Sequence, residues 1–262
     1  MAERLALVRV QPTAVIDWSA WLGGGAAALA AAYPHARRIV VEPHGALRER
    51  SARAADAPWW SLRRWAATPA TIADDDAQLP DGAAQLLWSN MALHMASDPL
   101  SRLRRWRRLV AIDGFLMFST LGPDTLATLR ALYRTLGWPP PAQDFIDMHD
   151  IGDLLVQAGF AEPVMDQEHL SLTWDSAGAL LGELRALGGN LHPARQRGLR
   201  TPRWRRRLES ALGERSDAQG RIALGFEIVY GHAFVAAPRA AVAARTEVPL
   251  ADLRAMIRRG RR

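Results

Sequence analysis

Polar side chains follow three short apolar runs of this sequence, at positions where they could bind a ligand. Asp17 lies in the run from Ala14 to Trp18, and Glu42 ends a second run, about 20 residues after a glycine-containing turn. Ser89 and Asn90 follow a third run. In dinucleotide-binding folds, an acid at the end of the second strand binds ribose hydroxyls. The spacing therefore indicates Glu42 as a residue for this contact.

The stretch from Leu86 to Thr125 is the element that would position these residues. Its two apolar runs, Leu86–Trp88 and Phe115–Phe118, are separated by a segment of helix length, which is typical of a β–α–β unit. Five residues of the segment recur every three or four positions and predict one buried stripe: Leu100, Leu103, Trp106, Leu109 and Val110. Both strands should be parallel, with Ser89 and Ser119 at their carboxyl ends, where open sheets bind ligands.

Other apolar runs predict the rest of a mostly parallel sheet. We expect strands near residues 14–18, 38–42, 69–73, 85–89 and 114–119, an edge strand at 162–174, and an antiparallel last strand at 223–235. Helices are expected at 147–158, 176–187 and 201–212. Pro139–Pro141 predicts a stiff loop, and the residues after it should reach over the pocket.

Several motifs of the chain resemble one enzyme family over roughly residues 15 to 235. The matching stretches are Ser89–His94, Phe118–Leu126, Phe145–Asp153, Ala158–Asp166 and Glu227–Ala233. They resemble the malonyl-acyl-carrier-protein O-methyltransferases of biotin synthesis, which are S-adenosylmethionine (SAM) enzymes. A more distant likeness is to the methyltransferase-fold assembly factors of respiratory complex I. The resemblance implies a Rossmann-like α/β fold with seven strands and helices on both faces of the sheet.

The resemblance also implies SAM as the cofactor. Seven residues match its binding positions: Asp17, Ser19, Gly23, Glu42, Asp76, Ser89 and Asn90. The family's loop after the first strand reads Asp-x-Gly-x-Gly-x-Gly, whereas this chain has Ser19 and Trp21 at the first two glycine places. Trp21 would put an indole where the cofactor lies, unless the loop shifts and uses Gly23–Gly25 instead. Gln85 also departs from the family's Asp.

Methylation of a carboxylate requires no general base, because a carboxylate is already ionised at neutral pH. The site has to hold one oxygen about 3–3.5 Å from the methyl carbon. An arginine fork would orient a malonyl carboxylate, and the candidates for hydrogen bonds to it are His94, Tyr230 and His232. We expect no metal. The resemblance implies acyl carrier protein or another malonyl thioester as the partner.

The composition indicates an acidic partner. The 262 residues carry a formal net charge of +6 and a pI near 10.9, and all 33 basic residues are arginine. No cysteine is present, which excludes disulfides and thiolate zinc sites. The sequence shows no apolar run long enough to span a bilayer and no signal-peptide core, so we expect a cytoplasmic protein. The oligomeric state is left open.

One domain is expected over residues 1–236, with an inserted cover region at about 124–150 and 175–212 and a basic tail at 237–262. Three functions are compatible with these observations. The first is an active SAM-dependent O-methyltransferase. The second is a paralogue that has lost SAM binding and acts as a binding or scaffold subunit, which Trp21, Ser19 and Gln85 favour. The third is nucleic-acid binding through the arginine runs, but no reading motif supports it, so we expect no nucleic acid.

Overall fold

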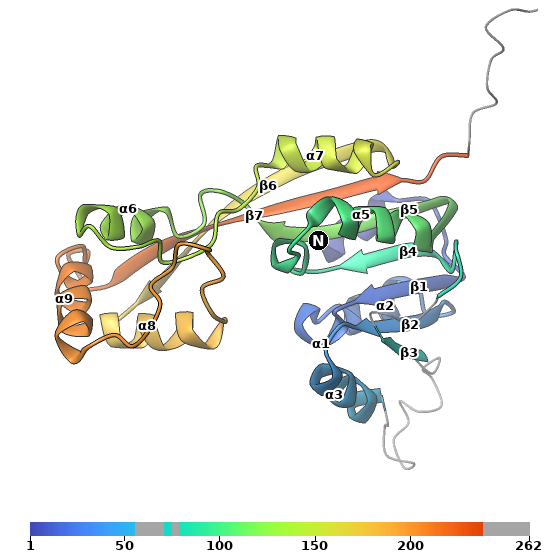
Figure 1. The fold of residues 1–262 in the computed structure, drawn as a ribbon. Helices are drawn as coiled ribbons and strands as arrows, with labels where there is room; N and C mark the ends of the chain where they lie inside the picture. Colours follow the sequence, from blue (N-terminus) through green and yellow to red (C-terminus); the bar gives the residue numbers. More distant parts are fainter. Residues whose placement is uncertain (56–70, 75–78, 238–262) are drawn as a thin grey trace, which may run out of the picture.

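The computed structural model describes residues 1–55, 71–74 and 79–237. Within them, seven strands form one sheet in the order β3-β2-β1-β4-β5-β7-β6 (Figure 1). The strands are β1 (Ala14–Trp18), β2 (Arg37–Glu42), β3 (Thr71–Asp74), β4 (Ala84–Ser89), β5 (Val110–Leu121), β6 (Ala161–Trp174) and β7 (Ile222–Phe234). The first five are parallel, and β7 runs antiparallel between β5 and β6. The predicted Rossmann-like sheet is confirmed.

Helices cover both faces of this sheet. They are η1 (Ala2–Leu7), α1 (Ala20–Gly23), α2 (Ala26–Ala32), α3 (Gly45–Ala55), η2 (Leu93–Met95), α5 (Pro99–Leu109), α6 (Ala127–Thr135), α7 (Met148–Gln157), α8 (Ala177–Ala186) and α9 (Pro202–Gly213). Four of them begin at a side chain that accepts a backbone N–H, namely Asp98, Asp147, Ser176 and Thr201. Three of these helices, α7, α8 and α9, lie where the sequence predicts helices.

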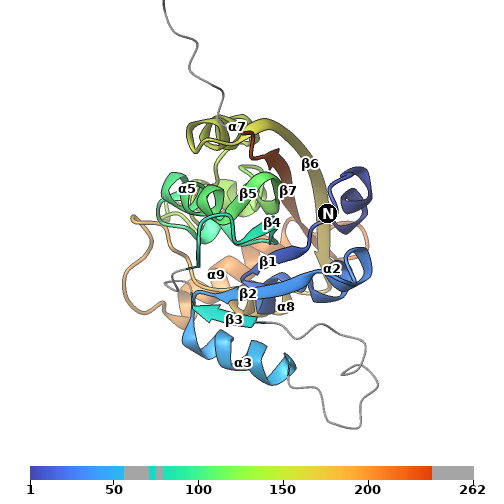
Figure 2. The ribbon, with the colours of Figure 1, turned by 90° about the vertical axis from the view of Figure 1, so that its right-hand side faces the viewer.

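The alternation of side chains along the strands divides the core into two layers. Ile16 and Trp18 pack with α5 and α7 on one face, whereas Val15 packs with η1 and α2 on the other. In Figure 2 the sheet is seen between these two layers. Three residues of the predicted stripe, Leu103, Trp106 and Leu109, are at most 2% exposed in α5. Leu100 is half-buried, and Val110 is buried as the first residue of β5.

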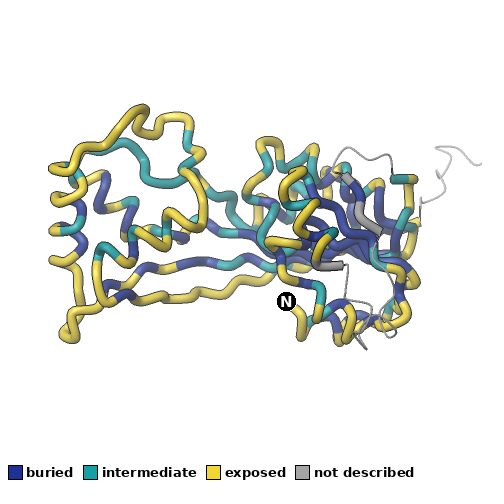
Figure 3. Tube along the Cα trace, turned by 90° about the horizontal axis from the view of Figure 1, so that it is seen from below, coloured by how far each residue is buried: buried dark blue, intermediate teal, exposed yellow. Residues whose placement is uncertain are grey.

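The outer half of the β6–β7 hairpin carries a second apolar cluster. It joins α6, α8 and α9 through Leu132, Leu180 and Leu212, and these helices gather at one end of the molecule (Figure 1). Most of β6 is exposed, as its yellow positions show in Figure 3, which fits an edge strand. These helices fall inside the expected cover region, so we keep that division of the domain as a proposal.

Two local differences from the sequence analysis have physical causes. β5 begins at Val110 rather than at 114, because a bulge at Ala84–Leu86 lets β4 pair with the residues before Gly114. Gln85 lies at the start of β4, and its side-chain oxygen accepts the backbone N–H groups of Thr13 and Ala14 at 3.1 and 3.0 Å. Its departure from the family pattern therefore concerns the amino end of β1 and not a cofactor.

The N-terminal residues and the chain ends complete the description. The described residues before β1 form the short helix η1, whose Leu5 is buried. The predicted Asp76 contact and the basic tail lie outside the described residues, apart from Ala237. None of the described helices is long and apolar enough to cross a membrane.

Gly114→Ala tests the packing of β5 on β4. A Cβ at this position would lie 2.6 Å from the Gln85 carbonyl oxygen and 2.9 Å from a methyl of Val110. We expect the free energy of unfolding to fall by about 2–3 kcal/mol, because the backbone has to move.

The matched control is Gly182→Ala in α8, where a Cβ meets nothing within 4 Å. Helix propensity predicts a gain of up to about 1 kcal/mol there. Urea unfolding measures the stability of both variants. Equal unfolding midpoints would contradict the close packing of Gly114 against β4.

Candidate functional site

Four parallel strands end at one edge of the sheet and place the predicted residues there. Trp18 of β1 pairs with Ser89 of β4, which pairs with Phe118 of β5, so Ser89 and Ser119 lie on neighbouring strands as expected. The hydroxyl of Ser119 donates to Asn90 Oδ1 at 2.5 Å and accepts the backbone N–H of Met91 at 3.1 Å. These bonds determine the path of the chain after β4.

The Glu42 carboxylate lies at the end of β2 and is 0% exposed. Its Oε1 accepts the backbone N–H of Trp21 and the hydroxyl of Ser51, each at 2.7 Å. Its Oε2 is buried and has no hydrogen-bond partner among the described residues. A carboxylate has room for further donors at each oxygen, so Oε2 can still accept from a ligand.

Asp17, one strand away in β1, is a second buried carboxylate. Arg38 Nε lies 3.3 Å from its Oδ2, but neither carboxylate oxygen has an aligned hydrogen bond within the described residues. Burial raises the pKa of Asp17 from 3.8 to about 6, against the opposing effect of Arg38, and the nearby charge of Glu42 raises it further. Two acids at adjacent strand ends therefore offer unused acceptor atoms.

The segment after β1 folds over these strand ends as the short helix α1. Ser19 enters it with a positive φ of 55°, and its backbone N–H donates to the Val41 carbonyl at 2.8 Å. At the other end, Asn90 Nδ2 donates to the Gly23 carbonyl at 2.6 Å. The α1 turn is thus tied to both β2 and the end of β4.

The Trp21 side chain is exposed beside α3. Its indole is 41% exposed, and the Arg50 guanidinium of α3 lies 5.9 Å from the ring centre. The backbone of the α1 turn, rather than the indole, lies against Glu42. That the indole lies where the cofactor binds stays a prediction.

The glycine triplet separates α1 from α2. Gly24 has φ +60°, and a Cβ on Gly25 would lie 2.4 Å from Trp88 Nε1. These two positions require glycine for the turn and for its close approach to β4. The triplet packs on β4, and Gly23 contacts Asn90.

A cavity of about 530 Å³ opens beside the ends of β4 and β5. His94 of η2 and Thr120 of β5 line it, together with Gln143–Ile146 and Leu191–Pro193. His94 Nδ1 lies 3.4 Å from Thr120 Oγ1, and burial lowers the pKa of His94 to about 4, so the ring is neutral at pH 7. The expectation that residues after Pro139–Pro141 reach over the pocket is met by Gln143, whose side-chain amide donates to the His94 carbonyl at 2.5 Å.

The two other predicted orienting residues do not line this cavity. Tyr230 and His232 lie opposite Ser119 and Met117 in the β5–β7 register, on the face that η1 covers. The Tyr230 hydroxyl donates to Glu168 Oε2 at 3.0 Å; its pKa is raised by burial and by this bond. Burial and Arg4 lower the pKa of His232. The pairing register puts Tyr230 and His232 on the other face of the sheet from His94, so the three candidates are not brought together.

Residues that the sequence analysis did not single out also line the cavity. His192 Nε2 lies 3.3 Å from Asp144 Oδ2, and the His192 Nδ1 accepts the Ala194 N–H at 3.0 Å, so the ring is held at both nitrogens. Neither residue has a spacing signal, since they come from loops about 50 positions apart in the chain.

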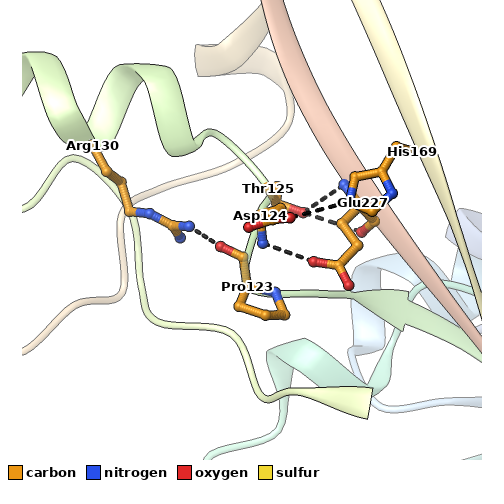
Figure 4. Close-up of polar contacts among 6 residues, drawn as sticks. All are labelled: Pro123, Asp124, Thr125, Arg130, His169 and Glu227. Carbon is orange, nitrogen blue, oxygen red and sulfur yellow. Dashed lines mark hydrogen bonds and ion pairs between the residues drawn. The ribbon is translucent and has the colours of Figure 1, made fainter.

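A separate polar cluster holds the loop after β5 (Figure 4). Glu227 of β7 is 3% exposed, and its Oε2 accepts the backbone N–H of Asp124 at 2.7 Å. His169 of β6 lies opposite Glu227 and contacts Asp124 Oδ2 at 3.1 Å. The ligand atoms of these three residues lie within 4.8 Å of one another. The bonds among them account for the arrangement, which we interpret as a clamp on the loop, and we assign no metal to it.

Two curated relatives of this chain carry the same name. The chain is 40% identical over 243 residues to the malonyl-[acyl-carrier protein] O-methyltransferase of Laribacter hongkongensis, covering 91% of this chain and 81% of that protein. The protein of this name from Gallionella capsiferriformans is 38% identical, with 91% and 82% covered. No protein-family profile matches the chain.

Solved structures show the same fold at much lower identity. The YcgJ protein from Bacillus subtilis superposes with a TM-score of 0.60 at 10% identity, covering 90% of this chain and 97% of that one. The [4+2]-cyclase SpnF gives 0.53 at 15% identity, with 90% and 81% covered. At such low identity the likeness shows the fold alone, and a fold does not identify the reaction.

Proposed function

Since this chain belongs to the malonyl-[acyl-carrier protein] O-methyltransferase family, we propose that it transfers a methyl group from SAM to the free carboxylate of a malonyl group on acyl carrier protein or coenzyme A. One observation carries this proposal beyond the family. The unused acceptor atoms of Asp17 and Glu42 lie at the same sheet edge as the His94 cavity, with the segment Asn90–His94 between them. A donor site and an acceptor site would then be neighbours.

The polar atoms at this edge fit the expected cofactor. Glu42 Oε2 is a free acceptor that can bind the ribose hydroxyls, and the Asp17 carboxylate can accept from a cationic amine. The buried hydroxyl of Ser89 also has no partner among the described residues. Ser19, Gly23 and Asn90 surround this position through the α1 turn. The turn covers Glu42, so it has to move when the cofactor enters.

The residues of the cavity account for the acceptor side. Bound SAM supplies an electrophilic methyl group. The cavity excludes water from the carboxylate and orients it, with the neutral His94 ring and the Thr120 hydroxyl available for hydrogen bonds. No arginine is among the described residues that line it, so the arginine fork expected from the sequence is not placed there. A carboxylate that is bound only by neutral groups is not neutralised by a cation and stays nucleophilic. It is already ionised, so no general base is needed.

The other two hypotheses differ in what supports them. The relatives reported above carry the names of enzymes, so the comparisons do not support the scaffold hypothesis. Nucleic-acid binding has only the arginine runs in its favour. The acyl carrier partner and the cytoplasmic location belong to this proposal and stay predictions.

Two measurements on the wild-type protein test the proposal. Calorimetry should detect SAM binding, and mass spectrometry should detect one added methyl on malonyl-carrier after incubation with SAM. The methyl ester should be absent when the acceptor is acetyl-carrier, which lacks a free carboxylate. Binding of the carrier without any SAM binding or transfer would favour the scaffold hypothesis instead.

A further inference from the structure

A second cavity lies between the same two chain segments as the first. It measures about 270 Å³ and is lined by Tyr133, Trp138 and Pro139 from one segment. From the other segment it is lined by Gln196, Leu199, Arg200, Thr201 and Trp204. The His94 cavity takes Gln143–Ile146 from the first segment and Leu191–Pro193 from the second. Between the cavities, Asn190 Nδ2 donates to the Pro140 carbonyl at 2.7 Å. The two cavities thus follow one another along a pair of adjoining segments.

The second cavity combines aromatic walls with the cation of Arg200. The ring centres of Trp138 and Trp204 are 5.0 Å apart, and those of Tyr133 and Trp138 are 5.4 Å apart. The Arg200 guanidinium lies 4.2 Å from the Trp204 ring centre, and Arg200 Nη1 donates to the Tyr133 hydroxyl at 3.5 Å. Stacking on the ring orients a guanidinium whose other N–H groups can bind a phosphate oxygen.

A basic surface adjoins this cavity. The segment from Arg195 to Arg207 contains seven arginines, all exposed, and no acid. Arg203 and Arg206 of α9 form no ion pair with any described residue, whereas Arg205 pairs with Glu209 at 2.7 Å. We call the exposed arginines of this segment that belong to α9, among them Arg203 and Arg206, the α9 surface.

Four of the five arginines of α5, the other basic run, make contacts within the fold. Arg107 Nε donates to the Gly159 carbonyl at 2.8 Å, and Arg108 lies 3.3 Å from Asp81. Arg102 and Arg105 stack over Trp18 at 5.0 and 5.3 Å from its ring centre. The α9 surface is therefore the better candidate for an acidic partner.

We propose that the two cavities are the two ends of one path for a phosphopantetheine arm, with the arm's phosphate at Arg200 and the acidic carrier protein on the α9 surface. This inference rests on the proposed function and specifies its partner surface. The order along the path fits such a substrate: the malonyl end lies by His94, the apolar part of the arm lies along Trp138 and Trp204, and the phosphate lies nearest to the basic helix. Charge complementarity then orients the carrier.

Three acceptors that share a malonyl thioester separate the parts of this path. Malonyl-carrier has the phosphate and the protein, malonyl-coenzyme A has the phosphate without the protein, and malonyl-N-acetylcysteamine has neither. Arg200→Gln should raise KM about tenfold for the first two acceptors and leave KM for the third unchanged, because only the phosphate contact is lost. The double variant Arg203→Gln/Arg206→Gln should raise KM for malonyl-carrier alone.

The control is Arg9→Gln/Arg37→Gln, which removes the same charge from two exposed positions at the amino end of the sheet. It should leave KM for all three acceptors unchanged. The proposal would be overturned if Arg200→Gln raised KM for malonyl-N-acetylcysteamine as much as for malonyl-carrier. It would also be overturned if KM for malonyl-carrier were unchanged in Arg200→Gln or in Arg203→Gln/Arg206→Gln.

Binding without turnover distinguishes this inference from the proposed function. Fluorescence anisotropy should show that the carrier with its arm binds more tightly than the carrier without it, and that Arg200→Gln removes this difference. Both affinities should fall with added salt, since exposed charges are screened over about 8–10 Å at physiological ionic strength. Equal affinity of the two carriers for the wild type, or tight binding of arbitrary DNA in place of the carrier, overturns the inference even if methyl transfer occurs.

Discussion

Glu42→Gln is expected to weaken SAM binding about ten- to a hundredfold. The carboxylate is fully buried, and its free Oε2 is the acceptor that we assign to the ribose hydroxyls. A hydrogen bond to a charged group contributes about 1.5–3 kcal/mol, against about 0.5–1.5 kcal/mol for a neutral one. In the glutamine the oxygen keeps the two Oε1 contacts, with the Trp21 N–H and the Ser51 hydroxyl, so an NH2 donor takes the place of Oε2. The loss therefore reports the Oε2 acceptor. Calorimetry with SAM measures the change.

The control for this variant is Glu168→Gln, which removes an exposed carboxylate that binds only Tyr230 among the described residues. It should bind SAM like the wild type. Unchanged affinity in Glu42→Gln would show that the cofactor does not use the end of β2.

Changes in the α1 turn should act on the same affinity in opposite directions. Trp21→Gly weakens a helical turn that has to leave Glu42, by about 0.5 kcal/mol from helix propensity, and should raise SAM affinity about twofold. Ser19→Gly relieves the strain of the positive φ of 55° and so stabilises the observed turn. This variant should lower SAM affinity. Adding Glu42→Gln to Trp21→Gly should cancel the gain. A shared increase for both single glycine variants would mean that the turn is not what limits binding.

Asp17→Asn and His94→Gln are expected to give opposite pH dependence of stability, each by about 3 kcal/mol. The folded-state pKa of Asp17 is raised to about 6 by burial, so the folded protein holds this proton above pH 4 while the unfolded chain releases it. The Asp17 contribution to the free energy of unfolding therefore falls as pH rises from 4 to 6. A shift of about two pKa units corresponds to about 3 kcal/mol.

The sign for His94 is the reverse. Its folded-state pKa is lowered to about 4 by burial, so between pH 4 and 6.5 the unfolded chain binds the proton and the folded protein does not. Its contribution rises with pH. The two effects nearly cancel in the wild type, so together these groups should leave its free energy of unfolding almost unchanged across this window.

The free energy of unfolding of Asp17→Asn should rise from pH 4 to 6.5, because only the His94 contribution remains. That of His94→Gln should fall from pH 4 to 6, because only the Asp17 contribution remains. Urea unfolding of both variants beside the wild type measures these changes. Parallel curves for all three proteins would contradict the buried states of both groups.

The sequence by itself determined the sheet and most of its helices. Apolar runs of strand length, the stripe of Leu103, Trp106 and Leu109, and the caps at Asp147, Ser176 and Thr201 are local signals, and each depends on residues a few positions apart. The same local logic placed Asp17, Glu42 and Ser89 at one edge, because the carboxyl ends of parallel strands meet there.

Only the tertiary structure decided what these residues contact. The β5–β7 register separates Tyr230 and His232 from His94, and a shift of one residue would have reversed their face. The α1 turn depends on Asn90, which is 67 positions from Gly23, and the His94 cavity joins loops about 50 positions apart. Such contacts depend on the packing of distant segments, for which spacing within one run of sequence carries no signal.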